Sequence, residues 1–466
     1  MPIEGVDPGI VKSYTRFALL RPLLCVFVFY LLGMAENISR YLAGLNKSAL
    51  MKYSLFFILL SDYVARLRAK SFVIGILIFV ASLTYGAYTF RATEYLNYLA
   101  SSTTFYEEHY IAPDEATIRF PITKRNLILV FLESMETTYF AKDEGGAFDN
   151  DLIPELKDLA KENINFSHNG MIGGAIQIAG TGWTTAGLVS HLFGIPLMLG
   201  VGGYPIDFVG KTHFFSGAKG LTDILHLHGY RMSFLIGSDK KFGGRDILFE
   251  THGETEVKDI NYYKKQGELP LDYMVWWGFE DRKLYHFAKD EIASMSSNHQ
   301  PFALILLTVD THHIGGYLCE LCGNKYPEQY KNVLECASKQ VVGFVQWVQS
   351  QPFYENTTIV IVGDHLYMDS QFFPDSISYD ERHAINIYIN SLASSDKRQK
   401  NRRFSTLDTF PTILDAMGAS YDGPGLGLGR SLFRDSPTLV EKYGVEYINK
   451  ELSKKSATYD RLLYGE

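Results

Sequence analysis

The chain has 466 residues, of which 46% are hydrophobic and 21% charged, and this composition predicts a large folded domain with accessory segments rather than a disordered protein. Its formal net charge of −8 argues against nucleic acid as the main partner, because binding a phosphate backbone needs a dense basic surface. No internal repeat or low-complexity tract is evident in the sequence.

The N-terminal part of the chain carries three apolar segments. Residues 71–90 contain no charge over twenty residues, which is the length needed to cross a bilayer. Residues 17–34 and 49–65 include charged side chains and are alternatively interfacial or buried helices. Basic residues open the first segment and fill the loop 66–70, so we predict three membrane spans, with the rest of the chain outside the cytoplasm. The late start of the first segment and the lack of a small-residue cleavage site argue against a signal peptide.

Three of the four cysteines lie close together in sequence, at Cys319, Cys322 and Cys336. A disulfide from Cys336 to Cys319 or Cys322 suits an oxidising compartment, which agrees with an extracytoplasmic position. A redox pair in the CxxC motif is an alternative, and a zinc site would need a second cysteine pair. The predicted domains are a membrane region 1–91, a membrane-surface linker 92–124, a catalytic domain 125–440 and a helical tail 441–466.

Short apolar runs have the pattern of strands buried on both faces, and they are residues 126–132, 301–309 and 358–362. Helix-like stretches lie among them, at residues 151–162, 219–228 and 330–348. This alternation predicts an α/β fold with a doubly wound, mainly parallel sheet flanked by helices. Ligand sites in such folds lie beyond the carboxyl ends of the strands.

Polar residues follow these strands directly. Glu133 ends the first, His312 and His313 follow the second, and Asp364 and His365 follow the third. Carboxylate and imidazole groups suit Mn²⁺, Mg²⁺ or Zn²⁺. A single carboxylate after a strand is more often a helix cap or a surface residue, but three ligand-type side chains at strand ends favour a shared metal site.

The segment 180–187, GTGWTTAG, combines small residues with hydroxyls. Such a segment opens a helix whose free N–H groups face an anion, and a hydroxyl placed there can serve as a nucleophile. The alternative is a Gly/Thr turn that only caps a helix.

Five motifs come one after another along the chain: NLILVFLES, GTGWTTAG with SHLFGIPL, LLTVDTHH, VIVGDHL, and FSTLDTFPTILDAMG with GLGLGRSLF. In this order they resemble the phosphoglycerol transferases of bacterial envelopes, in the sulfatase-like branch of the alkaline phosphatase superfamily. Lipoteichoic acid synthases and lipid A phosphoethanolamine transferases are more distant relatives. The resemblance covers about residues 126–433 and implies an alkaline phosphatase/sulfatase-like fold.

The resemblance also implies an activity and a location. Phosphoglycerol would pass from phosphatidylglycerol to an osmoregulated periplasmic glucan through a phospho-threonine intermediate, with release of diacylglycerol. The catalytic domain would lie on the periplasmic side of the bacterial inner membrane. The alternatives are phosphoethanolamine transfer to lipid A or another envelope glycan, and a degenerate domain that only binds.

The roles of individual residues follow from their positions in the motifs. One divalent metal, Mn²⁺ first and Mg²⁺ or Zn²⁺ as alternatives, would be held by Glu133, Thr184, Asp364 and His365. Thr184 would be the nucleophile, and His312 would exchange a proton with the leaving group and the acceptor. The substrate would be contacted by Trp183, Asp239, Lys241, Arg245 and His313, and His313 is also the alternative to His312.

The chain departs from its relatives at several motif positions. Trp183 stands where lipoteichoic acid synthases have a lysine, and their His-Gly-Asp and Trp-x-Arg contacts become Ile236-Gly237-Ser238 and Gly243-Gly244-Arg245. These changes argue against teichoic acid synthesis. The C/S-x-P-x-R motif that sulfatases need for formylglycine is missing around Thr184, which argues against hydrolysis of sulfate esters.

Overall fold

The computed structural model describes most of the chain after residue 100. The described residues are 101–465 without 115–116, 199–212, 299 and 395–398, and scattered positions between 63 and 100. By contacts the chain divides into two units, of which the first is residues 1–100 with 199–207 and the second is residues 101–198 with 208–466.

The predicted membrane spans fall on the first unit. Residues 17–34 lie outside the described residues, 49–65 do so apart from Tyr63, and 71–90 are described only in part. Within the described positions, no helix combines the length and the apolar character needed to cross a bilayer.

A seven-stranded sheet forms the centre of the second unit. Its strands are β1 (Asn126–Leu132), β2 (Gly174–Ile176), β3 (Arg231–Ile236), β4 (Glu256–Lys258), β5 (Phe302–Leu307), β6 (Thr357–Gly363) and β7 (His383–Ile389). Every residue of β1, β5 and β6 is buried, which explains why their sequences are apolar without alternation. These three are the strands predicted from the sequence, and the prediction is confirmed.

The strand order is β2-β7-β6-β1-β5-β3-β4. The strands from β6 to β4 in this order run parallel, whereas β7 pairs antiparallel with β6, and β2 pairs antiparallel with β7. The sheet is therefore mixed, with a parallel majority and an antiparallel edge. β1 lies between β5 and β6, so the carboxyl ends of the three predicted strands are neighbours.

Helices surround the sheet. Those of the described part are α5 (Phe105–His109), α6 (Pro154–Glu162), α7 (Thr184–Phe193), α8 (Leu221–Leu227), α9 (Arg245–Thr251), α10 (Ile260–Gln266), α11 (Asp281–Ser296), α12 (Gln329–Gln349), α13 (Thr409–Ala416), α14 (Leu439–Tyr443), α15 (Val445–Leu452) and α16 (Ala457–Tyr464). The helices expected at 151–162, 219–228 and 330–348 are confirmed as α6, α8 and α12.

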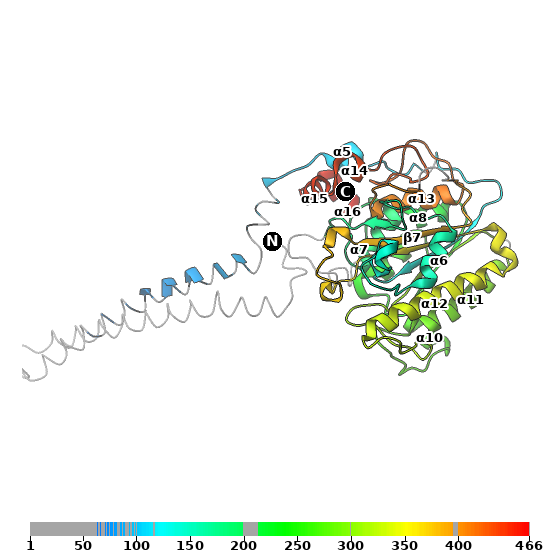
Figure 1. Ribbon diagram of the computed structural model, residues 1–466. Helices are drawn as coiled ribbons and strands as arrows, with labels where there is room; N and C mark the ends of the chain where they lie inside the picture. The colour runs from blue at the N-terminus through cyan, green and yellow to red at the C-terminus, as the bar shows by residue number, and fades with distance from the viewer. Residues whose placement is uncertain are drawn as a thin grey trace, which may run out of the picture. The chain divides into compact units, whose positions relative to one another are not determined.

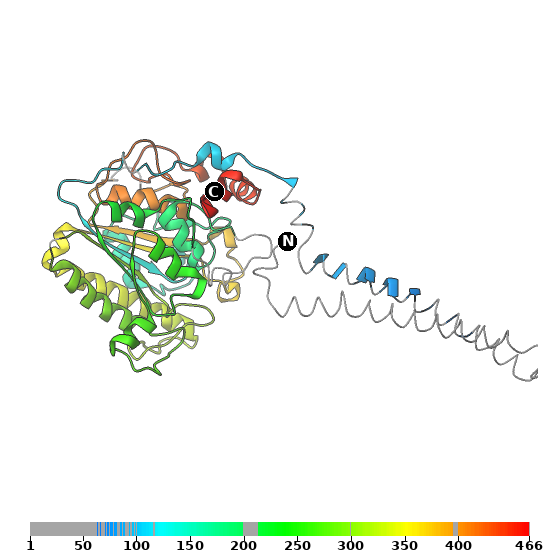
Figure 2. The ribbon, with the colours of Figure 1, turned by 180° about the vertical axis from the view of Figure 1, so that it is seen from behind.

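The helices form a layer on each face of the sheet (Figure 1, Figure 2). On one face α6, α11 and α12 pack together, and α7, α8 and α13 cover the other. Alternate residues of β1, such as Ile128 and Val130, lie in one buried apolar cluster with Leu156 of α6 and Val341 of α12. This packing holds the strand ends, and the residues that come after them, in fixed positions.

The segment before the sheet packs on the C-terminal helices. α5 contacts α16, Ser102 pairs with Lys455, and the rings of Phe105 and Tyr443 lie 6.1 Å apart. Figure 1 shows α5 beside α14, α15 and α16. The domain boundaries predicted from the sequence stay predictions.

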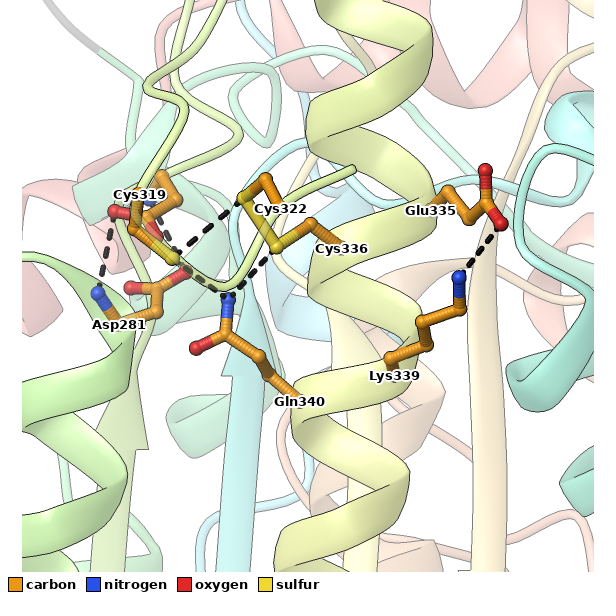
Figure 3. Close-up of a disulfide and its surroundings, with 8 residues drawn as sticks. Asp281, Cys319, Cys322, Glu335, Cys336, Lys339 and Gln340 are labelled. Atoms are coloured by element: carbon orange, nitrogen blue, oxygen red, sulfur yellow. Dashed lines mark hydrogen bonds and ion pairs between the residues drawn. A yellow bond between two sulfur atoms is a disulfide. The ribbon is translucent and has the colours of Figure 1, made fainter. Parts of the chain in front are cut away.

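One disulfide connects a loop to α12 (Figure 3). Cys322 in the loop before α12 is bonded to Cys336 in the helix, and Cys319 is a buried thiol whose Sγ lies 3.5 Å from that of Cys322. Of the two pairings left open by the sequence, the structure has Cys322 with Cys336. With two of the three sulfurs bonded to each other, the cluster is not a thiolate metal site.

Candidate active site

Three of the predicted metal ligands lie together at the carboxyl edge of the sheet. Glu133 follows β1, and Asp364 and His365 follow β6, whose last residue Gly363 is paired with Leu132. One donor atom from each of the three side chains lies within 4.8 Å of the others, and all three residues are buried. Adjacent parallel strands thus bring together side chains that are more than two hundred positions apart in sequence.

Hydrogen bonds orient the donor atoms of this cluster. The backbone N–H groups of Ser134 and His365 both donate to Asp364 Oδ1 at 2.8 Å, which leaves Oδ2 free. His365 Nδ1 lies 2.8 Å from the carbonyl oxygen of Leu366, so Nδ1 carries a proton, and Nε2 lies 3.2 Å from Glu133 Oε1 and 3.5 Å from Asp364 Oδ2. Ser134 Oγ donates to Glu133 Oε1 at 2.8 Å.

The residues present fit a divalent metal. Asp364 Oδ2 and His365 Nε2 are buried and make no hydrogen bond among the described residues, and they lie 3.5 Å apart, with Nε2 3.2 Å from Glu133 Oε1. Buried polar atoms are normally satisfied, so two that converge on one point indicate a missing partner. Two carboxylates and one imidazole are a donor set suited to Mn²⁺, Mg²⁺ or Zn²⁺.

Charges within the cluster shift its pKa values strongly. Burial lowers the pKa of His365, but the charges of Asp364 and Glu133 outweigh it and raise the pKa to about 10. Burial raises the pKa of Asp364 well above its usual value, and the charge of Glu133 adds to the rise. Burial also opposes the charge of Glu133, yet His365 holds the pKa of Glu133 below its usual value. A bound cation would compete with the proton on His365, so metal binding should weaken as the pH falls.

Thr184 joins this cluster from another element. It is the first residue of α7, and its Oγ1 lies 3.3 Å from Glu133 Oε2. The helix reaches this position because Gly187 has no side chain: a Cβ there would lie 2.3 Å from the carbonyl oxygen of Asp364. The first N–H groups of a helix have no partner within it and carry partial positive charge, which favours an anion in front of Thr184.

His312 and His313 follow β5 on a neighbouring loop. His312 is partly buried, and its Nδ1 lies 2.5 Å from the carbonyl oxygen of His313, so Nδ1 is the donor and Nε2 remains to exchange a proton. The imidazole of His312 also contributes to the lowered pKa of Glu133, so His312 lies near the cluster. His313 Nδ1 is buried without a hydrogen-bond partner among the described residues.

Arg245 is the predicted substrate contact with the clearest geometry. Its side chain is buried, one terminal nitrogen donates to the carbonyl oxygen of Asp239 at 2.9 Å, and Nε has no partner among the described residues. Burial lowers the pKa of Arg245 to about 10, while the charge of Glu133 acts in the opposite direction. A buried guanidinium with a free N–H beside the cluster suits a phosphoryl oxygen.

The other predicted contacts lie farther out or have structural partners. Trp183 is the residue that precedes α7. Asp239 is exposed, and its carboxylate accepts from Lys241 N at 2.8 Å and from Asn261 Nδ2 at 3.1 Å, so it orders its own turn. Lys241 is exposed. Binding roles for these residues stay predictions.

A buried ion pair that was not predicted from the sequence supports the segment after His365. Glu136 accepts two hydrogen bonds from Arg382, at 2.8 and 2.5 Å. Glu136 also accepts from the N–H of Tyr367 at 3.0 Å, and Arg382 donates to the carbonyl oxygen of Tyr367 at 2.7 Å. Glu136 lies in the FLESME segment, but no sequence signal connects it with Arg382.

We expect Arg382→Met to lower the free energy of unfolding by about 3–5 kcal/mol, because it leaves the charge of the buried Glu136 carboxylate without its cationic partner. Denaturant unfolding of the full chain in detergent would measure the change. Lys339→Met is the control, since it removes an exposed pair with Glu335 and should cost at most about 1 kcal/mol. Equal losses of unfolding free energy in Arg382→Met and Lys339→Met would contradict a stabilising role for the buried ion pair.

A second feature that the sequence did not predict is a buried carboxyl pair below His312. Asp281 accepts from the N–H groups of Val309 and Asp310 at 2.7 and 3.1 Å, and Asp310 Oδ1 accepts from the N–H of Asp281 at 3.2 Å. Asp310 Oδ2 is buried without a partner in the described part. Burial and the charge of Asp281 raise the pKa of Asp310 to about 9, and burial raises that of Asp281 to about 7.

We expect Asp310→Asn to stabilise the protein increasingly as the pH rises. The folded pKa of about 9 lies above the usual carboxyl value of about 4, so the folded state holds this proton more tightly. The wild-type protein therefore loses stability from about pH 4 up to about pH 9, and the asparagine removes that loss. The free energy of unfolding of the variant should exceed that of the wild type by an amount that grows from pH 5 to pH 9 and reaches about 1–3 kcal/mol. The difference between their melting temperatures should grow over the same pH range. A difference that does not change with pH would contradict the expectation.

Comparisons with known proteins place the chain in a family. The family model described as Sulfatase matches residues 125–419, which is more than half of the chain. The chain belongs to the sulfatase family. Phosphoglycerol transferase I of Citrobacter koseri is 31% identical to this sulfatase-family chain over 323 residues, covering 68% of the chain and 40% of that relative. Phosphoglycerol transferase I of Salmonella paratyphi B is 32% identical over 320 residues, 67% of the chain and 39% of the relative. The resemblance predicted from the motifs is confirmed, although the chain spans only about two fifths of the length of these curated relatives.

Solved structures show the same fold. An alkaline phosphatase superfamily protein from Vibrio parahaemolyticus superposes with a TM-score of 0.52 at 18% identity, covering 71% of this chain and 77% of that one. The lipoteichoic acid synthase LtaP from Listeria monocytogenes superposes with a TM-score of 0.54 at 16% identity, covering 71% and 80%. The predicted alkaline phosphatase/sulfatase-like α/β fold is confirmed.

Proposed function

We propose that this sulfatase-family protein is a metal-dependent phosphotransferase of the bacterial inner membrane, acting on the periplasmic side. It moves phosphoglycerol from phosphatidylglycerol to a periplasmic glucan and releases diacylglycerol. The observation that carries the proposal is the 3.3 Å contact between Thr184 Oγ1 and Glu133 Oε2, because it joins a hydroxyl nucleophile to the Glu133, Asp364 and His365 cluster.

The metal would be held by Glu133, Asp364, His365 and the hydroxyl oxygen of Thr184. When bound, it would lower the pKa of that hydroxyl and neutralise charge that develops at the phosphoryl group. Asp364 Oδ2 and His365 Nε2, which are buried without a hydrogen bond in the described part and converge with Glu133 Oε1, support this assignment. Mn²⁺ is the expected ion, with Mg²⁺ and Zn²⁺ as alternatives.

In the first half of the reaction, the proton of the Thr184 hydroxyl passes to solvent water, and Thr184 Oγ1 forms a bond to the phosphorus of phosphatidylglycerol. The bond from phosphorus to the diacylglycerol oxygen breaks, and His312 Nε2 gives that oxygen a proton. Arg245 holds a phosphoryl oxygen through its free Nε, and the first turn of α7 adds partial positive charge. The product is phosphoglycerol bound to Thr184.

In the second half, a glucan hydroxyl attacks the same phosphorus and gives its proton to His312. The bond between phosphorus and Thr184 Oγ1 breaks, and Thr184 takes back from solvent water the proton that it gave up in the first half. General acid–base catalysis of this kind contributes about 10²–10⁴-fold to the rate. Over both halves no proton is gained or lost by the protein.

Two observations support phosphoglycerol as the transferred group. The curated relatives are named phosphoglycerol transferase I, and a threonine at position 184 without a formylglycine motif suits phosphoryl transfer rather than sulfate-ester hydrolysis. Phosphoethanolamine would need an anionic contact for its ammonium group. On the loop before Arg245, the exposed carboxylate is that of Asp239. This carboxylate already accepts hydrogen bonds from Lys241 N and from Asn261 Nδ2.

The proposal is tested with the full chain in vesicles, Mn²⁺ and head-group-labelled lipid, with and without a glucan. Diacylglycerol should appear from phosphatidylglycerol, and the label should move to the glucan. Release of diacylglycerol from phosphatidylethanolamine alone would show that phosphatidylethanolamine, and not phosphatidylglycerol, is the donor. No release from either lipid, together with no bound metal, would overturn the proposed activity.

A further inference from the structure

A group of exposed apolar side chains lies beside the candidate active site. Met274, Trp276 and Trp277 belong to the loop between α10 and α11 and are 61%, 37% and 40% exposed, and Phe242 on the neighbouring loop is 48% exposed. The rings of Phe242 and Trp277 lie 5.9 Å apart, and those of Trp276 and Trp277 6.5 Å apart. We call these four residues the aromatic rim.

The backbone holds the two tryptophans outward. Val275 and Gly278 exchange two backbone hydrogen bonds of 2.8 Å, so Trp276 and Trp277 are the central residues of a tight turn. Trp276 has φ 50°, a left-handed conformation that bulky residues avoid. In such turns this position is usually occupied by Asn or Gly. Gly278 presses the turn against the end of β3, since a Cβ there would lie 1.9 Å from the carbonyl oxygen of Gly237. Strain of this kind, together with exposed indole rings, indicates a functional surface.

The aromatic rim adjoins the residues that would handle the phosphoryl group. The ring of Trp277 lies 4.8 Å from that of His312, and the guanidinium of Arg245 lies 5.4 Å from the ring of Phe242. Ile314, two residues after His312, is 71% exposed. His312 thus has exposed apolar side chains on its own loop and on the rim loop.

The leaving group of the reaction indicates which ligand covers the aromatic rim. This inference rests on the proposed function, in which the leaving group is diacylglycerol. His312 would protonate the oxygen of diacylglycerol, so the acyl chains begin a few bonds from His312, beside the ring of Trp277 at 4.8 Å. Met274 and Ile314 offer no hydrogen bonds to a sugar and suit hydrocarbon. Tryptophan favours the boundary between lipid and water, and the exposed Lys241 beside Phe242 suits an anionic lipid surface.

We infer that the aromatic rim is a lipid-contact surface that takes the acylglycerol end of the donor at the face of the bilayer. The acceptor would reach the same phosphorus after diacylglycerol has left. The rim would therefore act in the first half of the reaction and set the preference for a donor with long acyl chains.

The tryptophan fluorescence of the full chain tests this contact directly. The four tryptophans are Trp183, Trp276, Trp277 and Trp347, so none lies in the predicted membrane spans. In vesicles whose acyl chains are brominated, we expect fluorescence to be quenched relative to ordinary vesicles. The double variant Trp276→Phe, Trp277→Phe should lose at least about half of that quenching, and the control Trp347→Phe on α12 should keep it. Absence of quenching in the wild type, or equal quenching in the double variant, would overturn the inference.

A kinetic experiment separates the lipid from the other ligand that could cover the rim. In the double variant Met274→Ser, Trp276→Ser, turnover of long-chain phosphatidylglycerol in vesicles should fall about tenfold more than turnover of a soluble short-chain analogue. Leu227→Ser, a matched change at an exposed residue of α8, should alter neither. If donor cleavage is normal and only transfer to the glucan falls, the rim binds the acceptor and the inference is wrong. If quenching is as expected but no phosphatidylglycerol is consumed, the lipid contact stands and the proposed function fails.

Discussion

Thr184→Ala is expected to abolish phosphoglycerol transfer, with kcat lowered by at least about 10³-fold, and to remove any covalent phosphorus adduct. The reason is that Thr184 Oγ1 is the hydroxyl that contacts the cluster of Glu133, Asp364 and His365, at 3.3 Å from Glu133 Oε2, and alanine leaves nothing to attack the phosphorus. Thr184→Ser keeps a hydroxyl at the same place and should retain adduct formation. Peptide mass spectrometry after incubation with phosphatidylglycerol and no acceptor would detect the adduct.

The neighbouring residue offers a matched control for this prediction. Thr185 is buried in the same first turn of α7 and is the same residue type, but the structure places only Thr184 against Glu133. Thr185→Ala should therefore lower kcat by less than about tenfold, and the covalent phosphorus adduct should still form. An adduct that persists in Thr184→Ala, or equal losses in the two alanine variants, would remove Thr184 from the role of nucleophile.

Asp364→Asn is expected to weaken binding of Mn²⁺ by at least about 10²-fold without unfolding the protein. The asparagine Oδ1 can still accept the two N–H groups of Ser134 and His365, while the amide nitrogen replaces the free Oδ2 that would bind the metal. Burial raises the pKa of Asp364, so in metal-free protein the neutral asparagine should be no less stable than the carboxylate.

The measurement is a thermal melt with and without Mn²⁺, together with metal analysis of the purified chain. The free energy of unfolding of the wild type should rise by about 2.7 kcal/mol when the metal is present at a hundred times its dissociation constant. That of Asp364→Asn should rise by almost nothing at the same metal concentration. Asp408→Asn is the control, because Asp408 is also buried and accepts backbone N–H groups from Ser405 and Arg430, but it does not belong to the metal-ligand cluster. Loss of the gain in both variants would show a general destabilisation rather than a lost ligand.

Three strands of the sheet and the candidate metal-ligand residues were predictable from local pattern. Residues 126–132, 301–309 and 358–362 are apolar on both faces, which only strands buried between two helix layers need, and they became β1, β5 and β6. Residues at the carboxyl ends of adjacent parallel strands must lie close together, so Glu133, Asp364 and His365 could be named before their distances were known. Thr184 was reached through motif order, and the local sequence alone would have favoured a helix cap.

Other parts of the site depend on contacts that no local pattern encodes. Arg382 pairs with Glu136 across 246 positions, and a charged residue gives no sign in sequence of the partner that will neutralise it. Trp276 and Trp277 look in the sequence like core residues, because hydrophobicity alone does not show which apolar side chains a turn will hold outward. Whether Cys336 pairs with Cys322 or with Cys319 was likewise open.

By itself, the sequence of this protein determined the three central strands β1, β5 and β6, the helices α6, α8 and α12, and the side chains that follow those strands, since these come from the pattern of the apolar residues and from the residues that interrupt it. Only the tertiary structure decided the antiparallel edge of the sheet, the approach of α7 to Asp364 at Gly187, the Glu136–Arg382 pair and the exposure of the aromatic rim. The physical reason is that these features come from packing between distant elements, and packing energies depend on distances between atoms that the order of residues does not specify.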